Sequence, residues 1–208
     1  MTKNEIISKL VEINAIKLSP SEPFTWASGW LSPIYCDNRK ILSYPLVRKL
    51  ISQGFQNVIN TQFSNVDAIA GVATGAIAHG AIVAEALNLP FVYVRSSPKK
   101  HGLENLVEGD LKPGQRIVVV EDLISTGKSS LKAVDAIRSA GAEVVGMVAI
   151  FTYGFDVAKR NFDEKGVPFF TLADYPQLID YALNIGMVNP SQMHVLEKWR
   201  DNPQVWGR

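Results

Sequence analysis

The chain has 208 residues, of which 47% are hydrophobic and 20% are charged, and its formal net charge is +1. This composition is ordinary for a globular protein, and the length suits one large domain or a core with a small appendage. The near-neutral charge gives no indication of a surface that binds nucleic acid. The single cysteine, Cys36, excludes an intramolecular disulfide framework and fits a reducing compartment.

The first 19 residues form an interrupted amphipathic pattern that includes acidic side chains. They lack the continuous apolar stretch of a signal peptide. No other run approaches the roughly 20 apolar residues that a membrane span requires. We therefore expect a cytoplasmic protein without a membrane partner.

Apolar periodicity predicts helices and strands along most of the chain. Residues 4–14 and Pro45 to about Phe63 are expected to be helices, separated by an irregular segment at residues 20–40. Strands and helices then alternate, which predicts an α/β fold with a mainly parallel sheet flanked by helices. The expected strands are 67–73, 91–95, 117–121, 144–151 and 169–171, and the expected helices are 75–87, 129–140, 175–185 and 190–200. Residues 96–114 show no clear period, and so long a connection inside a domain is usually functional.

The segment Ile117–Ser130, IVVVEDLISTGKSS, carries the strongest chemical signal. Its four apolar residues indicate a buried parallel strand, and Glu121 and Asp122 are expected where that strand ends. Most of the residues at 125–129 are small and precede a helix, so backbone N–H groups, hydroxyls and the helix N-terminus could surround an anion. A Walker A loop is excluded, because Asp122 replaces the glycine that this motif needs five residues before Gly127.

Two further segments should lie at the same edge of the sheet, because each follows a predicted parallel strand. Gly71–Gly75 allows a close backbone approach to an anion. Arg95–Gly102 concentrates basic side chains at the start of the long connection. Alone, the first could be a simple strand-to-helix turn and the second a solvated surface run. With the acidic pair, they suit a sugar bearing a phosphate at one end and a pyrophosphate at the other, namely phosphoribosyl pyrophosphate (PRPP).

The stretch VVVEDLISTGKSS resembles the PRPP-binding motif of type I phosphoribosyltransferases, in which four apolar residues precede two acids and a Thr-Gly loop. Phe24–Arg39 resembles the N-terminal signature of the orotate-specific members, and the spacing of Arg95, Lys99 and His101 resembles their catalytic loop. The resemblance implies a type I phosphoribosyltransferase fold. A small N-terminal hood, residues 1–40, would join a PRPP-binding core, residues 41–208, in a single compact unit.

The resemblance also implies an activity: transfer of the phosphoribosyl group from PRPP to orotate. Mg²⁺ would be carried by PRPP rather than ligated by protein side chains, and a loop would be shared across a homodimer. Lys99, His101 and Asp122 would be catalytic, and Ser125 would contact orotate. The pyrophosphate loop would be Ala73, Thr74 and Gly75. PRPP binding is implied for Arg95, Lys99, His101, Glu121, Asp122, Leu123, Ile124, Ser125, Thr126, Gly127, Lys128 and Ser129.

The chain departs from the family pattern at positions where a basic residue is common. Many members carry a lysine where this chain has Leu31, and some carry a lysine at Thr74 or an arginine near Tyr153. Two alternatives remain: a phosphoribosyltransferase for another base, such as a purine, and a PRPP-sensing regulator without turnover. The Phe24–Arg39 signature argues against the first, and the basic residues Lys99 and His101 argue against the second.

Overall fold

The computed structural model of the chain describes residues 2–26, 29–97 and 106–207. Its centre is a six-stranded sheet with the order β10-β9-β8-β5-β6-β7, in which all neighbouring pairs are parallel except β6 and β7. The strands are β5 (Ala68–Val72), β6 (Phe91–Val94), β7 (Val107–Glu108), β8 (Arg116–Ile124), β9 (Glu143–Thr152) and β10 (Phe169–Asp174). The predicted α/β fold with a mainly parallel sheet is therefore confirmed.

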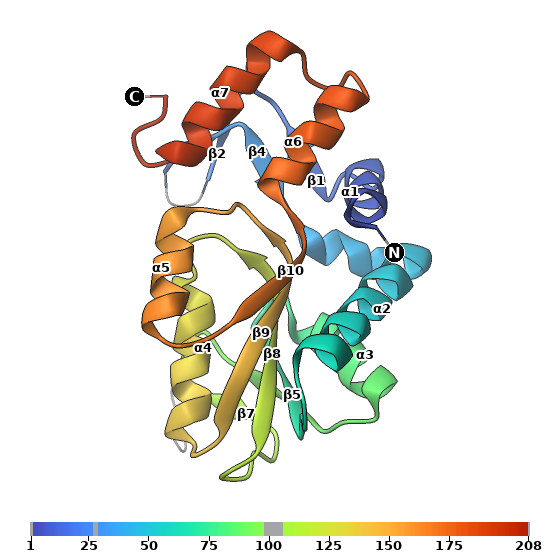
Figure 1. Cartoon of the computed structure of the whole chain (residues 1–208), viewed down its shortest axis with the longest axis vertical. Coiled ribbons are helices and arrows are strands. Elements are labelled where there is room, and N and C mark those ends of the chain that lie inside the picture. The colour runs from blue at the N-terminus through green and yellow to red at the C-terminus, as the bar shows by residue number, and fades with distance from the viewer. Residues whose placement is uncertain (1, 27–28, 98–105, 208) are drawn as a thin grey trace.

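Helices cover both faces of this sheet (Figure 1). One face is covered by α2 and α3 and the other by α4 and α5, while α1 packs beside β10 and against α6. In α4, Leu131, Val134 and Ile137 form a buried apolar face, and Gly141 follows the helix with φ +88°. The helices are α1 (Lys3–Glu12), α2 (Pro45–Gln62), α3 (Ile77–Leu87), α4 (Lys128–Ser139), α5 (Asp156–Glu164), α6 (Tyr175–Asn184) and α7 (Pro190–Asp201).

The N-terminal segment is more regular than its sequence indicates. Two short antiparallel pairs join β1 (Ile16–Leu18) to β4 (Ile34–Cys36) and β2 (Phe24–Thr25) to β3 (Leu31–Ser32). A 3-10 helix, η1 (Asn38–Ser43), then leads into α2. The expectation of an irregular segment was therefore only partly right. Strands of two or three residues are too short to show a period.

Three other elements differ from the prediction. β8 continues to Ile124, so Glu121 and Asp122 lie within the strand rather than at its end. β7 adds an antiparallel strand within residues 96–114, where no element was expected. α5 was not predicted: only Ala158 and Phe162 of its nine residues are buried, so its apolar face is short.

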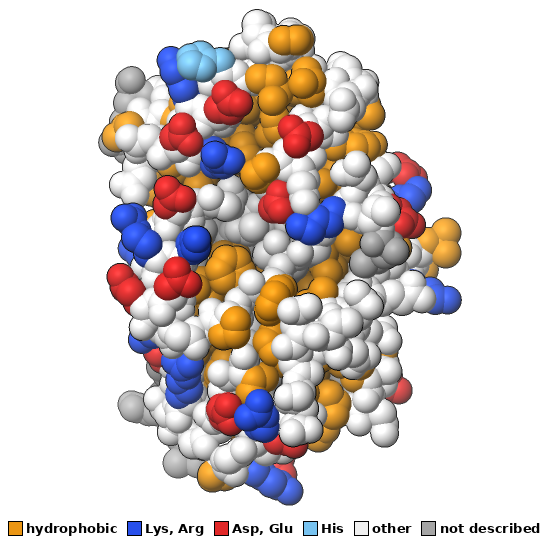
Figure 2. Space-filling view, in the orientation of Figure 1, with side chains coloured by type: hydrophobic (Ala, Val, Ile, Leu, Met, Phe, Trp, Pro, Cys, Tyr) orange, Lys and Arg blue, Asp and Glu red, His pale blue; other side chains and the backbone are white. Residues whose placement is uncertain are grey.

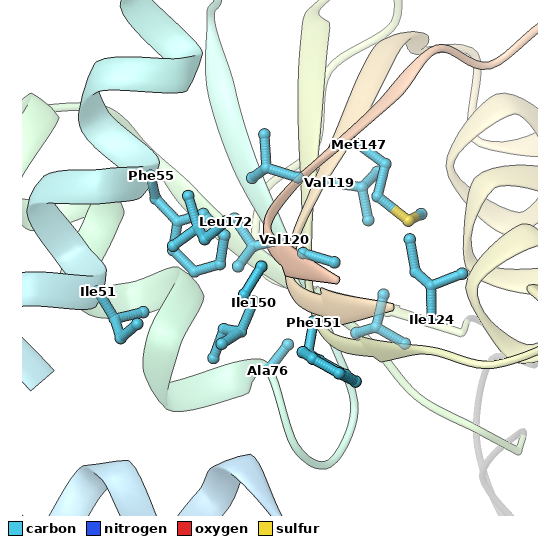
Figure 3. Packing of buried hydrophobic residues seen from close by; sticks show 14 of the residues in the cluster. Ile51, Phe55, Ala76, Val119, Val120, Ile124, Met147, Ile150, Phe151 and Leu172 are labelled. Carbon is cyan, nitrogen blue, oxygen red and sulfur yellow. The ribbon is translucent and has the colours of Figure 1, made fainter. Parts of the chain in front are cut away.

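The core lies between the sheet and its helices. All five residues of β5 are buried, as expected for a central parallel strand. Figure 3 shows Val120 and Ile150 on the side of the sheet that Phe55 of α2 covers, and Met147 on the opposite side. Each fully buried aliphatic side chain of this kind contributes about 1.5–3 kcal/mol. These contacts hold the strand ends in register and thereby position the loops that follow them.

The surface carries charges of both signs. On the face in Figure 2, basic and acidic side chains are interspersed rather than gathered into one large area of a single sign. Within the described residues, no helix is both long enough and apolar enough to cross a membrane.

Candidate active site

The three predicted loops leave the same edge of the sheet. β8, β5 and β6 are adjacent and parallel, so the segments after Ile124, Val72 and Val94 emerge side by side. The strand order also reverses here: β6 and β7 lie on one side of β5, and β8, β9 and β10 lie on the other. A ligand crevice is expected at such a reversal, beyond the carboxyl ends of the two diverging strands.

A cavity of about 790 Å³ joins residues from all three loops. Ala73 comes from the first loop, Arg95 from the second, and Thr126 and Ser129 from the third. The cavity then runs along α4. Its volume lies within the usual range for small-molecule sites. The predicted convergence of the three loops is therefore confirmed.

The acidic pair divides between two environments. Glu121 is 4% exposed, and its carboxylate accepts hydrogen bonds from Ser130 Oγ (2.8 Å) and from the backbone N–H of Asp122 (3.0 Å). Burial, followed by the charge of Asp122, raises the pKa of Glu121 well above its ordinary value. Asp122 is half-buried, and its carboxylate occupies the space that a Cβ on Gly75 would need. Asp122 is thus the member of the pair that faces the first loop.

The first loop contains Ala73, Thr74 and Gly75. The Ala73–Thr74 peptide bond is cis, and the Ala73 N–H donates to Val94 O at 2.8 Å. Gly75 must lack a side chain because Asp122 lies against it. Gly71 has a different reason: a Cβ there would meet Ala76 O and the Phe91 ring within the fold. Packing within the fold therefore accounts for Gly71 without a ligand.

The third loop has backbone geometry that suits an anion. Gly127 has φ +77° and stands at the N-cap of α4, where no side chain caps the free N–H groups of the first turn. Those N–H groups and the helix dipole favour a negative ligand. Ser125 and Thr126 are half-buried, whereas Lys128 and Ser129 are exposed at the start of the helix. Leu123 and Ile124 supply the end of β8 that leads into the loop.

The α5 helix supports this loop from beneath. Asn161 Nδ2 donates to Thr126 O at 2.9 Å, and the ring of Phe162 lies where a Cβ on Gly127 would be. Phe162 is in turn packed on Phe169 of β10, with ring centroids 4.5 Å apart. Sequence reasoning missed Asn161 and Phe162 because α5 itself was not predicted.

A backbone hydrogen bond and an ion pair hold Arg95, the first residue of the second loop. Arg95 N–H donates to Leu106 O at 2.8 Å, and the Arg95 guanidinium lies 3.4 Å from the Glu108 carboxylate. Arg95 therefore remains at the edge of the cavity, as predicted. Lys99 and His101, the other basic residues expected in the site, lie outside the described residues.

Two of the three departures from the family pattern, Tyr153 and Leu31, pack against other parts of the chain. Tyr153 is 3% exposed and stacks on Trp26, with centroids 5.1 Å apart, while Trp199 meets it edge-on at 5.5 Å. Burial raises the pKa of Tyr153 well above its usual value. Leu31 lies against Gly207 in the C-terminal tail. An arginine or lysine at either position would bring a charge into these contacts.

Comparison with known proteins agrees with the geometry of the site. The phosphoribosyl transferase domain family matches residues 38–174. The orotate phosphoribosyltransferase of Porphyromonas gingivalis is 60% identical over 202 residues, which cover 97% of this chain and 96% of the relative. The solved orotate phosphoribosyltransferase of Aeropyrum pernix is 28% identical with a TM-score of 0.77, covering 88% of this chain and 99% of that one.

A more distant solved structure shares the fold. The Mycobacterium tuberculosis H37Rv orotate phosphoribosyltransferase in complex with PRPP is 23% identical with a TM-score of 0.66, covering 85% of this chain and 98% of that one. The chain belongs to the phosphoribosyltransferase family and, within it, to the orotate phosphoribosyltransferases.

Proposed function

We propose that this protein transfers the 5-phosphoribosyl group of PRPP to orotate, giving orotidine 5′-monophosphate and pyrophosphate in pyrimidine biosynthesis. The observation that carries the proposal is the meeting of two loops at the carboxyl ends of β5 and β8, where the strand order reverses. There an acidic pair, a helix N-terminus and a close-approach glycine loop meet in a chain 60% identical to a named orotate phosphoribosyltransferase.

PRPP would lie across this crevice with its two ends in different loops. The 5′-phosphate suits the cradle at residues 125–129, where free N–H groups, hydroxyls and the α4 dipole favour an anion. The pyrophosphate suits Ala73, Thr74 and Gly75, where backbone groups can approach it closely. Asp122, which lies between the two loops, would hold the ribose hydroxyls. The names of the solved relatives fit this substrate, since one of them is a complex with PRPP.

The reaction needs charge stabilisation more than covalent catalysis. As the C1–O bond of PRPP breaks, positive charge develops on the ribose and negative charge on the departing pyrophosphate. Asp122 would stabilise the ribose charge, and Arg95, with Lys99 and His101, would stabilise the pyrophosphate. A ring nitrogen of orotate, held near Ser125, then forms the new bond to C1. Exclusion of water by the closed site would suppress hydrolysis of the reactive sugar.

Mg²⁺ is the proposed cofactor. Among the described residues, no three His, Cys, Asp or Glu side chains gather into a metal site. The residues present fit an ion held mainly by PRPP oxygens and water, with Asp122 as the carboxylate beside it, because Mg²⁺ keeps waters and commonly binds substrate phosphates. When bound, Mg²⁺ would neutralise charge on the pyrophosphate.

We also propose a homodimer in which the loop after β6 contributes Lys99 and His101 to the partner's site. The reducing compartment suggested by the single Cys36 makes the cytoplasm the proposed location. Nucleic acid and membrane are not among the proposed partners.

A base panel tests the proposed function. Purified protein is incubated with PRPP, Mg²⁺ and orotate, uracil, adenine, guanine or hypoxanthine, and nucleotide and pyrophosphate are measured. We expect products with orotate and little with the other bases. Preference for a purine would identify a different phosphoribosyltransferase. Binding of PRPP by calorimetry without turnover of any base would favour the regulator.

A further inference from the structure

The backbone of Asp122 is held by a residue from a distant part of the chain. Asn38, the first residue of η1, donates its side-chain amide to Asp122 O at 2.6 Å across 84 residues of sequence. Asn38 is 1% exposed. A direct hydrogen bond of this length, with one partner fully buried, fixes both partners closely.

This contact lies just beyond the point where the pairing of β5 with β8 ends. β5 pairs with β8 only as far as Gly71 opposite Val120, whereas β8 continues beside β9 as far as Ile124. Beyond Val120, β8 therefore lacks β5 as a neighbour on one side. The carbonyl of Asp122 has no β5 donor beside it, and the amide of Asn38 supplies one.

Asn38 is itself anchored on the opposite wall of the gap. Its backbone O lies 3.4 Å from Nε2 of His79, a residue of α3 that is 2% exposed. Asn38 thus contacts α3, which follows the first loop, through its backbone O, and β8, which precedes the third, through its side-chain amide. Both loops that would hold the two ends of PRPP are connected through it.

One atom of the Asn38 amide lacks a hydrogen-bond partner among the described residues. This atom, Oδ1, is buried. An orphaned acceptor is unfavourable for stability, and an apolar side chain of the same size would avoid it. The presence of an amide at position 38 is therefore explained by its Nδ2 group, which donates to Asp122 O.

We propose that Asn38 is a positioning residue: its amide takes the place of the absent strand beyond Val120 and sets where the Asp122 carboxylate lies over Gly75. This inference rests on the proposed role of Asp122 in the reaction. If Asn38 is lost, the end of β8 can shift, and displacement of a transition-state contact by about 1 Å can cost up to about 100-fold in rate.

The main test is Asn38→Leu, which keeps the size of the side chain while removing both the donor and the orphaned acceptor. We expect kcat to fall roughly 10- to 100-fold, and KM for orotate to change by less than about threefold. The thermal midpoint should stay near that of the wild type. Tyr175→Phe is the matched control, because it removes another buried hydrogen bond, from Tyr175 Oη to Leu196 O at 3.2 Å, outside the site. It should leave kcat unchanged.

A double variant separates positioning from general destabilisation. Asn38→Leu should cause little further loss of kcat in an Asp122→Asn background, because it acts through Asp122. Multiplying losses would overturn the inference, as would wild-type kcat in Asn38→Leu. Asn38→Ser enters the same cycle if the leucine variant does not fold.

The two proposals fail in different ways. Wild-type kcat in Asp122→Asn alone would remove the role of Asp122 and, with it, the role of Asn38. An inactive Asp122→Asn beside a fully active Asn38→Leu would contradict only the positioning role and leave the proposed function standing.

Discussion

Glu121 and Asp122 are neighbours in the sequence, yet the fold gives their carboxylates different surroundings. Glu121 is turned into the protein toward Ser130, and Asp122 faces the first loop across Gly75. Two acids that could have shared one role are therefore distinguishable. Glu121 shapes the end of β8 through its hydrogen bonds, and Asp122 is the group available to a ligand.

The burial of Glu121 predicts a pH-dependent stability. Its folded-state pKa is raised, so the folded protein binds more protons than the unfolded chain between the ordinary value of 4.5 and the raised one. The stability from this group is therefore full below pH 4.5 and is lost as pH rises through the folded pKa. Glu121→Gln has no carboxyl group to titrate at this position, so its folding stability should not fall in this way as pH rises.

Thermal unfolding of the wild type and Glu121→Gln from pH 4.5 to 8 measures the effect. The midpoint of the variant should rise relative to the wild type as pH increases. A difference of about 1 kcal/mol would move the midpoint by about 2–4 °C in a chain of this length. A constant offset across the range would show that Glu121 does not titrate in the expected way.

At the scale of elements, α5 is the support of the phosphate cradle. Asn161 holds Thr126 O, and Phe162 fills the space beneath Gly127. The loop therefore depends on a helix that follows it by about 30 residues in the chain. The cradle keeps its shape because it is bonded and packed from below rather than because its own sequence is rigid.

Gly127→Ala should damage this cradle. The new Cβ would meet Phe162 in a backbone of φ +77°, which by itself costs a non-glycine residue about 1–2 kcal/mol. We expect lower thermal stability and a KM for PRPP raised about tenfold or more, equivalent to about 1.4 kcal/mol of binding. Gly166→Ala is the control: it also has positive φ (+61°), but a Cβ there meets nothing within 4 Å. Equal effects on KM for PRPP in both variants would rule out the support role of α5.

The elements differ in how readily the sequence predicts them. β5 and β8 are continuous apolar runs between turn signals, so their positions and parallel order follow from local pattern and topology rules. α5 buries only two of its nine side chains, so its apolar face is small and the other residues are mostly polar. The extension of β8 past Val120 depends on β9, and the bond from Asn38 to Asp122 joins residues 84 apart. Neither contact leaves a local signal, and both shape the site.

At the scale of the whole molecule, topology brings the chemistry together. The strand order reverses beside β5, and the loops that follow β5 and β8 face each other across the gap. The N-terminal segment supplies Asn38 and Trp26, which pack on the ends of β8 and β9, and the C-terminal helix adds Trp199 to the same contacts. The N-terminal segment and the C-terminal helix thus both lie at this end of the sheet (Figure 1).

A shared loop in the proposed homodimer predicts complementation. Lys99→Ala and Asp122→Asn should each be inactive alone. In a random 1:1 mixture, half of the dimers are mixed and each holds one intact site, so about a quarter of wild-type activity should return. Activity is measured after mass spectrometry has verified the mixed dimers. No recovery in verified mixed dimers would show that Lys99 serves its own subunit.

The most direct measurement of the central claim is orotate-dependent release of pyrophosphate from PRPP by the wild type and by Asp122→Asn. The wild type should release pyrophosphate in step with orotidine 5′-monophosphate. Asp122→Asn should be slower by about 100-fold or more with an unchanged thermal midpoint, because it loses charge stabilisation at the ribose. No orotate-dependent release by the wild type, or an equal rate in the variant, would contradict the account.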